Sequence, residues 1–168
     1  MVENICIRKL RPVDWELMRS IRLLALESAP GVFLSCFEEE AVLEKRDWVS
    51  RVSDPQGAIF GLFDLECIIG LTGANIWSED PSGRTAIFVM DFIHPDYRGL
   101  GLAKYLYESR IEWAKSMKCS RVRLGVRATN RVALETAKKF GFKQMDMKQV
   151  NWPDGNSDKE FIMERRLF

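Results

Sequence analysis

The residues best suited to chemistry lie between an apolar segment and an amphipathic one. The run Arg98-Gly99-Leu100-Gly101-Leu102-Ala103 places two glycines two positions apart, directly before a predicted helix. Glycine adopts backbone angles closed to other residues and lets a ligand approach the main chain. The first turn of a helix offers unpaired N–H groups and a partial positive charge. The segment is therefore suited to binding a pyrophosphate, with Arg98 ordering the loop or adding charge.

Two other phosphate-binding loops fit this segment less well. A P-loop needs Gly-Lys-Ser/Thr at the helix start, where this sequence has Gly101-Leu102-Ala103. A dinucleotide fingerprint needs a third Gly or Ala three residues after Gly101 and an acidic residue about 20 residues further on. Lys104 and Arg121 stand at those positions. On the turn alone, a glycine-rich connection that binds no ligand remains an alternative.

The elements around this loop must hold it in place. Thr85–Ile93 is an almost continuous apolar run, interrupted by Asp91, and predicts a strand buried in the middle of a sheet. Gly101–Ser116 predicts a helix whose stripe packs on that sheet: Leu102, Tyr105, Leu106, Ser109, Trp113 and Met117. We expect further strands near 5–10, 58–65, 67–77, 121–126, 142–150 and 161–167, and helices near 14–28, 43–52 and 130–140. This order predicts an α/β fold with a mixed sheet and helices on both faces.

Composition and charge exclude several classes of protein. The 168 residues suit a single domain over 1–168. Twenty-five basic residues nearly balance 24 acidic ones, so the basic excess that nucleic-acid or polybasic membrane binding needs is missing. No run approaches the roughly 20 apolar residues of a membrane helix, and nothing at the N-terminus resembles a signal peptide. We expect a cytoplasmic protein with no nucleic-acid or membrane partner.

A metal site is not expected. The four cysteines form no C-x-x-C pair, and His94 is the one histidine, so the spacing of a zinc site is missing. Cys6, Cys67 and Cys119 lie among apolar residues and are predicted to be buried free thiols.

Residues 85–142 strongly resemble the GNAT superfamily of N-acetyltransferases, and the rest of the chain resembles it more loosely. Arg98-Gly99-Leu100-Gly101-Leu102-Ala103 matches the family's acetyl-CoA loop, Arg/Gln-x-x-Gly-x-Gly/Ala, in full. Ile93-His94-Pro95-Asp96-Tyr97-Arg98 matches its lead-in, with Ile in place of Val. The family's second motif is matched downstream by Val126, Asn130, Ala133, Gly141 and Phe142.

The resemblance implies a fold and a set of cofactor contacts. The fold is a mostly antiparallel sheet of about seven strands with a splayed central parallel pair, here Thr85–Ile93 and Arg121–Val126. Acetyl-CoA is the implied co-substrate. Its pyrophosphate would lie on the amides of Gly99, Leu100, Gly101, Leu102 and Ala103, and its pantetheine arm would pair with Phe92 and Ile93. Asn130 would hydrogen-bond the cofactor, cap the helix that follows, or do both.

The residues that would act on the acceptor are less clearly marked. Asp91, inside the central strand, is either a base or amine-binding group facing a cleft, or one half of an ion pair. The acidic run Glu38-Glu39-Glu40 is predicted to be a loop that is solvated or that attracts a cationic acceptor. Family members often carry a tyrosine seven residues after the Asn to protonate the thiolate, and Ala137 stands there. Thiols ionise near pH ~8.5, so water could supply that proton.

Three functions follow as hypotheses. The first is an N-acetyltransferase for a primary amine of a small molecule or peptide. A lysine-like amine has a pKa near ~10.4 and must lose a proton before it attacks. The second is an acyl-CoA sensor without efficient turnover, which Ala137 favours. The third is a structural domain that kept only the fold. The sequence leaves open whether the chain forms a homodimer.

Overall fold

The computed structural model describes residues 3–168. Within them the chain forms seven strands and five α-helices, and short 3-10 turns at Pro12–Asp14 and Pro95–Tyr97. The strands are β1 (Ile5–Lys9), β2 (Gly57–Asp64), β3 (Cys67–Ile76), β4 (Thr85–Ile93), β5 (Arg121–Arg127), β6 (Lys143–Asn151) and β7 (Ser157–Arg166). The helices are α1 (Trp15–Ser28), α2 (Phe37–Ala41), α3 (Lys45–Ser53), α4 (Ala103–Ser116) and α5 (Arg131–Lys139).

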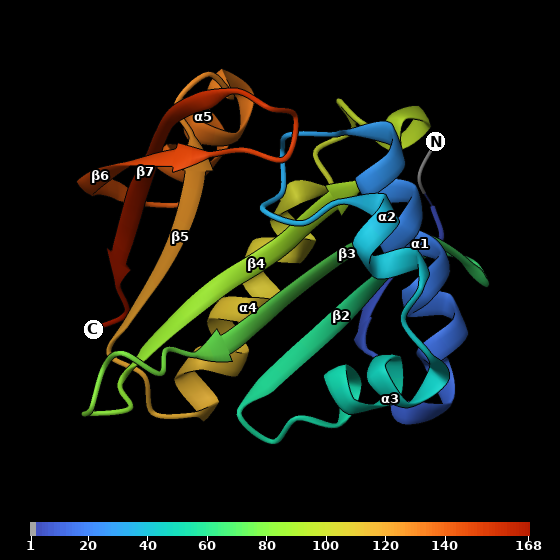
Figure 1. The fold of residues 1–168 in the computed structure, drawn as a ribbon. Helices are drawn as coiled ribbons and strands as arrows, with labels where there is room; N and C mark the ends of the chain where they lie inside the picture. The colour runs from blue at the N-terminus through green and yellow to red at the C-terminus, as the bar shows by residue number, and fades with distance from the viewer. Residues whose placement is uncertain (1–2) are drawn as a thin grey trace.

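One seven-stranded sheet, in the order β1-β2-β3-β4-β5-β7-β6, runs through the molecule (Figure 1). Neighbouring strands are antiparallel except for β4 and β5, which are parallel. β4 and β5 pair only from Thr85–Ile87 to Arg121–Arg123, and beyond those residues they diverge (Figure 1). The predicted fold class, with its splayed central pair, is confirmed.

Helices cover the two faces of the sheet unequally. The α4 face, as we name it, packs against α4 and α5 in a core that includes Phe88, Val122 and Phe142. The opposite α1 face packs against α1 and α3 over β2, β3 and β4, in a core that includes the fully buried Trp48. The C-terminal strands lie away from α1–α3 (Figure 1). Their α1 face therefore carries no helix from this group.

Several local predictions were wrong. Glu38-Glu39-Glu40 belongs to the short helix α2 rather than to a loop, and Glu40 is buried. The buried stripe of α4 is Leu106, Tyr107, Arg110, Ile111 and Ala114, which is rotated away from the predicted one because a buried arginine belongs to it. Of the three cysteines expected to be buried, Cys119 is buried, whereas Cys6 in β1 and Cys67 at the start of β3 are exposed.

Candidate active site

The glycine loop, residues 98–103, leaves the end of β4 and enters α4. Both of its glycines have positive φ angles, +75° at Gly99 and +74° at Gly101. L-residues rarely adopt such angles, and glycine does so without steric cost. A Cβ atom at either position would meet nothing within 4 Å. The glycines are therefore needed for the path of the chain, and open space lies beside them.

The backbone amides of this loop are free to bind a ligand. In the described part of the chain, none of the N–H groups from Gly99 to Ala103 donates a hydrogen bond to a turn carbonyl or a side chain. Leu102, the N-cap of α4, has no side-chain capping bond. Helix N-termini usually satisfy these donors with a cap, with water or with an anion. This geometry suits a diphosphate, which has many acceptor oxygens.

Arg98 already contacts the end of β4. Its Nε donates to the carbonyl oxygen of Ile93 at 2.9 Å, and its guanidinium lies 5.6 Å from the centre of the Phe92 ring. The side chain therefore orders the loop against the strand. Ile93 is also one of the two residues predicted to pair with the pantetheine arm. Phe92 is buried and Ile93 half-buried, so the backbone, rather than the Phe92 side chain, is available to a ligand at this end of the strand.

A bulge re-aims the end of β4 near the splay. Leu71 pairs with Phe92 and Gly73 with Val89, so β4 has one residue more than β3 between these pairs. Met90, in the bulge, has a φ of +62°. Bulges bend a strand and change the direction of its side chains. The result places Asp91 and Thr72 together on the α4 face, where α4 supplies a partner.

Asp91 is ion-paired. Its Oδ1 lies 2.6 Å from Nη1 of Arg110, and its Oδ2 accepts from Nη2 of the same residue at 3.0 Å. Thr72 donates to Oδ1 as well, at 2.5 Å. The Arg110 side chain is 1% exposed and that of Asp91 39% exposed. Both carboxylate oxygens are engaged, so the ion-pair alternative holds, while the exposed edge of Asp91 faces solvent.

Sequence reasoning missed Arg110 and Tyr107. The Arg110 guanidinium lies 4.2 Å from the ring centre of Phe88 and 4.8 Å from that of Tyr107. Tyr107 stacks on Phe140 of the neighbouring helix with ring centres 4.3 Å apart, and its burial raises the pKa of the phenol. The one available signal was Asp91 itself, because a carboxylate within a buried strand requires a cation.

Asn130 caps α5. Its Oδ1 accepts a hydrogen bond from the amide of Ala133 at 3.2 Å, so the capping role is confirmed. That bond uses the acceptor end of the side chain and leaves the NH₂ group available to a ligand. Ala137, where the family often has tyrosine, is fully buried. It packs in the same core as Tyr107 and Phe142, so this position offers no hydroxyl.

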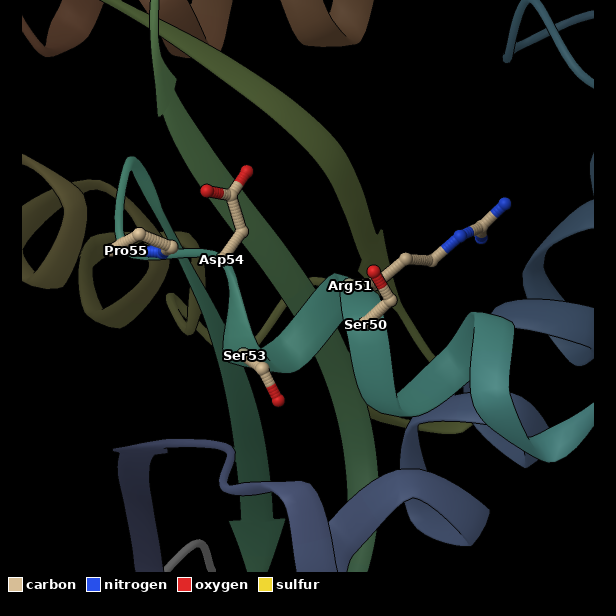
Figure 2. A pocket seen from close by; sticks show the side chains of 5 residues that line it. All are labelled: Ser50, Arg51, Ser53, Asp54 and Pro55. Carbon is tan, nitrogen blue, oxygen red and sulfur yellow. The ribbon is translucent and has the colours of Figure 1, made fainter.

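Surface hollows lie elsewhere as well. One, with a volume of about 460 Å³, is lined by Ser50, Arg51, Ser53, Asp54 and Pro55. It lies at the end of α3, next to the start of β2, whereas the glycine loop follows the end of β4. Since β2 and β4 run in the same direction, this hollow and the glycine loop lie at opposite ends of the strands. Figure 2 shows its side chains pointing in different directions rather than converging. We therefore place the candidate site at the loop and the splay.

Comparison with known proteins agrees with this geometry. The sequence model of the acetyltransferase (GNAT) family matches residues 18–142, which is most of the chain. The chain belongs to the GNAT acetyltransferase family. Among curated proteins, none matches the sequence.

Solved structures of GNAT-like proteins share this fold. An acetyltransferase of the GNAT family from Streptococcus pneumoniae has a TM-score of 0.82 and 19% identity, with 96% of this chain and 98% of that chain covered. A putative acetyltransferase from Salmonella typhimurium, solved with its cofactor acetyl-CoA, has a TM-score of 0.84 at 15% identity, with 99% of this chain and 95% of that chain covered. An N-acetyltransferase from Staphylococcus aureus Mu50 has a TM-score of 0.78 at 18% identity, with 99% of this chain and 100% of that chain covered.

In residues 3–168, no helix combines the length and apolar character that crossing a bilayer requires. Within the same residues, no three His, Cys, Asp or Glu side chains cluster as metal ligands would.

Proposed function

We propose that this GNAT protein transfers an acetyl group from acetyl-CoA to a primary amine of a small molecule or peptide. The observation that carries the proposal is the run of amides from Gly99 to Ala103 that have no partner in the described chain. A diphosphate would take these donors at the start of α4. The acetyl-CoA in the Salmonella structure, which has the same fold, supports this choice of ligand.

The splay gives the rest of the cofactor a place to lie. β4 ends at Ile93 and β5 continues to Arg127, and the two strands do not pair beyond Ile87 and Arg123. A pantetheine arm can pair with strand backbone as an added strand does. A main-chain N–H at the bulge can then polarise the thioester carbonyl. The NH₂ group of Asn130 donates to the cofactor from the α5 side.

The remaining parts of the proposal concern the whole chain and its setting. Residues 1–168 act as one acetyltransferase domain. The free cysteines suit a reducing compartment, so we place the protein in the cytoplasm. The leaving thiolate takes its proton from water, since Ala137 supplies none.

A thiol-release assay tests this function. Acetyl-CoA is mixed with the protein and with butylamine, an amino sugar, an α-amino acid or a peptide with a free N-terminus. At least one amine should raise the rate of CoA thiol release well above the rate without enzyme, and mass spectrometry should show the amine about 42 Da heavier. This increase corresponds to the replacement of one hydrogen atom of the amine by an acetyl group.

The buried Ala137 supports a second function, an acyl-CoA sensor. Calorimetry with acetyl-CoA separates the alternatives. Binding without thiol release from any amine would favour the sensor. Neither binding nor release would leave a structural domain.

A further inference from the structure

Glu160, on β7, is a buried carboxylate that the fold leaves without a partner. Its residue is 7% exposed, and its Oε2 is buried with no hydrogen-bond partner in the described chain. No ion pair within residues 3–168 includes it. A buried carboxylate without a partner is strongly destabilising, so folds rarely keep one without a use.

The basic residues next to Glu160 are directed elsewhere. Arg127 lies opposite it on β5 and Lys148 opposite it on β6. The Arg127 guanidinium binds Asp154 at 2.6 Å, Asp158 at 3.3 Å and the carbonyl of Gly31 at 2.9 Å. Lys148 is exposed. Glu164, on the same strand and face, provides the contrast, because its Oε2 lies 2.6 Å from Nε of Arg123.

The Glu160 carboxylate lies over Gly125 of β5. A Cβ atom at Gly125 would collide with Oε1 of Glu160, so the missing side chain makes room for the carboxylate. Gly125 is exposed and stands two residues beyond Arg123, the last residue of β5 that pairs with β4. The carboxylate is therefore at the mouth of the splay, next to open surface.

Glu160 lies on the face opposite the glycine loop. Val122, Leu124 and Val126 point into the α4-face core, so the alternate residues of β5 and their partner Glu160 belong to the α1 face. The glycine loop and Asn130 begin the helices of the α4 face. A cofactor held there would present its acyl carbon where β4 and β5 diverge. Over the C-terminal strands the α1 face carries none of the helices α1–α3, so an attacking amine can approach from that side (Figure 1).

We propose that Glu160 binds the ammonium group of the acceptor and takes one proton from it. This inference rests on the proposed function. The neutral amine then attacks the thioester carbon, a C–N bond forms and the C–S bond breaks. The second proton passes from nitrogen through water to the thiolate, which leaves as the CoA thiol, and Glu160 returns its proton to solvent. The acceptor class is thus an alkylamine that is a cation at neutral pH.

The variant Glu160→Gln tests the assignment with Glu164→Gln as its matched control. With an alkylamine that the wild type acetylates, Glu160→Gln should lower kcat/KM by about 10²- to 10⁴-fold, the usual contribution of a positioned base. Its affinity for acetyl-CoA, measured by calorimetry, should stay within about threefold, and its thermal midpoint should not fall. Glu164→Gln should lower the midpoint and leave kcat/KM within a few-fold.

A second variant moves the carboxylate without removing it. Gly125→Ala places a Cβ against Oε1 of Glu160 and should also lower kcat/KM, with acetyl-CoA affinity preserved. The proposal is overturned if Glu160→Gln keeps kcat/KM within threefold of the wild type, or if its loss merely follows a loss of thermal stability, as in Glu164→Gln. If the wild type itself acetylates no amine, the proposed function fails first, and that result is visible before any variant is made.

Discussion

Asn130 performs one task that the structure shows and is positioned for a second. Its Oδ1 caps α5 by accepting from the Ala133 amide, and its NH₂ group has no partner within the described chain. The two ends of this amide can be separated by substitution. Aspartate caps helices as well as asparagine does, but it cannot donate.

The variant Asn130→Asp should therefore separate capping from cofactor binding. We expect its free energy of unfolding to stay within about 0.5 kcal/mol of the wild type, since the cap is kept. Its affinity for acetyl-CoA should fall about tenfold, because one hydrogen bond of about 1–1.5 kcal/mol is lost. Chemical denaturation and calorimetry measure the two quantities. Asn130→Ala, the control, should lose about 1 kcal/mol of stability as well, and an unchanged affinity in both variants would exclude the contact.

At the scale of elements, ion pairs hold the helices of the α1 face together. Glu40 of α2 binds Arg22 of α1 at 2.8 Å and Arg51 of α3 at 2.8 Å. Burial alone would raise the pKa of Glu40, but the hydrogen bonds and charge of Arg22, aided by Arg51, lower it to about 2. One carboxylate thus joins three helices beside the α1 face.

The variant Glu40→Gln should lower the free energy of unfolding by about 3 kcal/mol at pH 7, because two guanidinium groups lose their anion. Since the pKa of Glu40 in the folded protein, about 2, lies below the unfolded value of about 4.3, the stabilisation is complete above that value and is lost as the pH falls towards 2. In denaturation experiments, the difference in free energy of unfolding between wild type and variant should therefore shrink as the pH is lowered from about 4.3 to about 2. The control Glu39→Gln, at an exposed neighbouring residue, should have the same free energy of unfolding as the wild type. A difference for Glu40→Gln that does not change with pH would contradict the assignment.

Elements were predictable where the hydrophobic pattern determined them. The central strand at Thr85–Ile93 and the helix after Asn130 follow from apolar runs and from a capping residue. Glu40 and Arg110 were missed because each pairs with a residue distant in sequence. Pattern reasoning assigns a charged side chain to the surface, and only tertiary contacts show that it is buried with a partner.

At the scale of the whole molecule, the two proposed tasks fall on opposite faces of the sheet. The glycine loop, with its unpartnered amides, and the capping residue Asn130 lie at the starts of the helices on the α4 face. Glu160 lies beside Gly125 on the α1 face. Between these two groups of residues β4 and β5 diverge (Figure 1). The path of the glycine loop and the cap at Asn130 were predictable from local motifs, because glycines before a helix and an asparagine at its start have a local meaning. The surroundings of Glu160 were not predictable, because they are made by the neighbouring strand β5. The sequence does not show that β5 pairs with β7, the strand that carries Glu160.

Binding of acetyl-CoA by the glycine loop is the claim on which the account depends, and calorimetry on three proteins tests it. Wild type should bind acetyl-CoA. Gly101→Asp should bind it at least about 100-fold more weakly, because its carboxylate repels the diphosphate at the helix start. Gly83→Asp, at a partly exposed turn glycine with a similar φ of +65° and no atom within 4 Å of an added Cβ, should bind like the wild type. Equal affinity in a folded Gly101→Asp protein and in wild type would contradict the account.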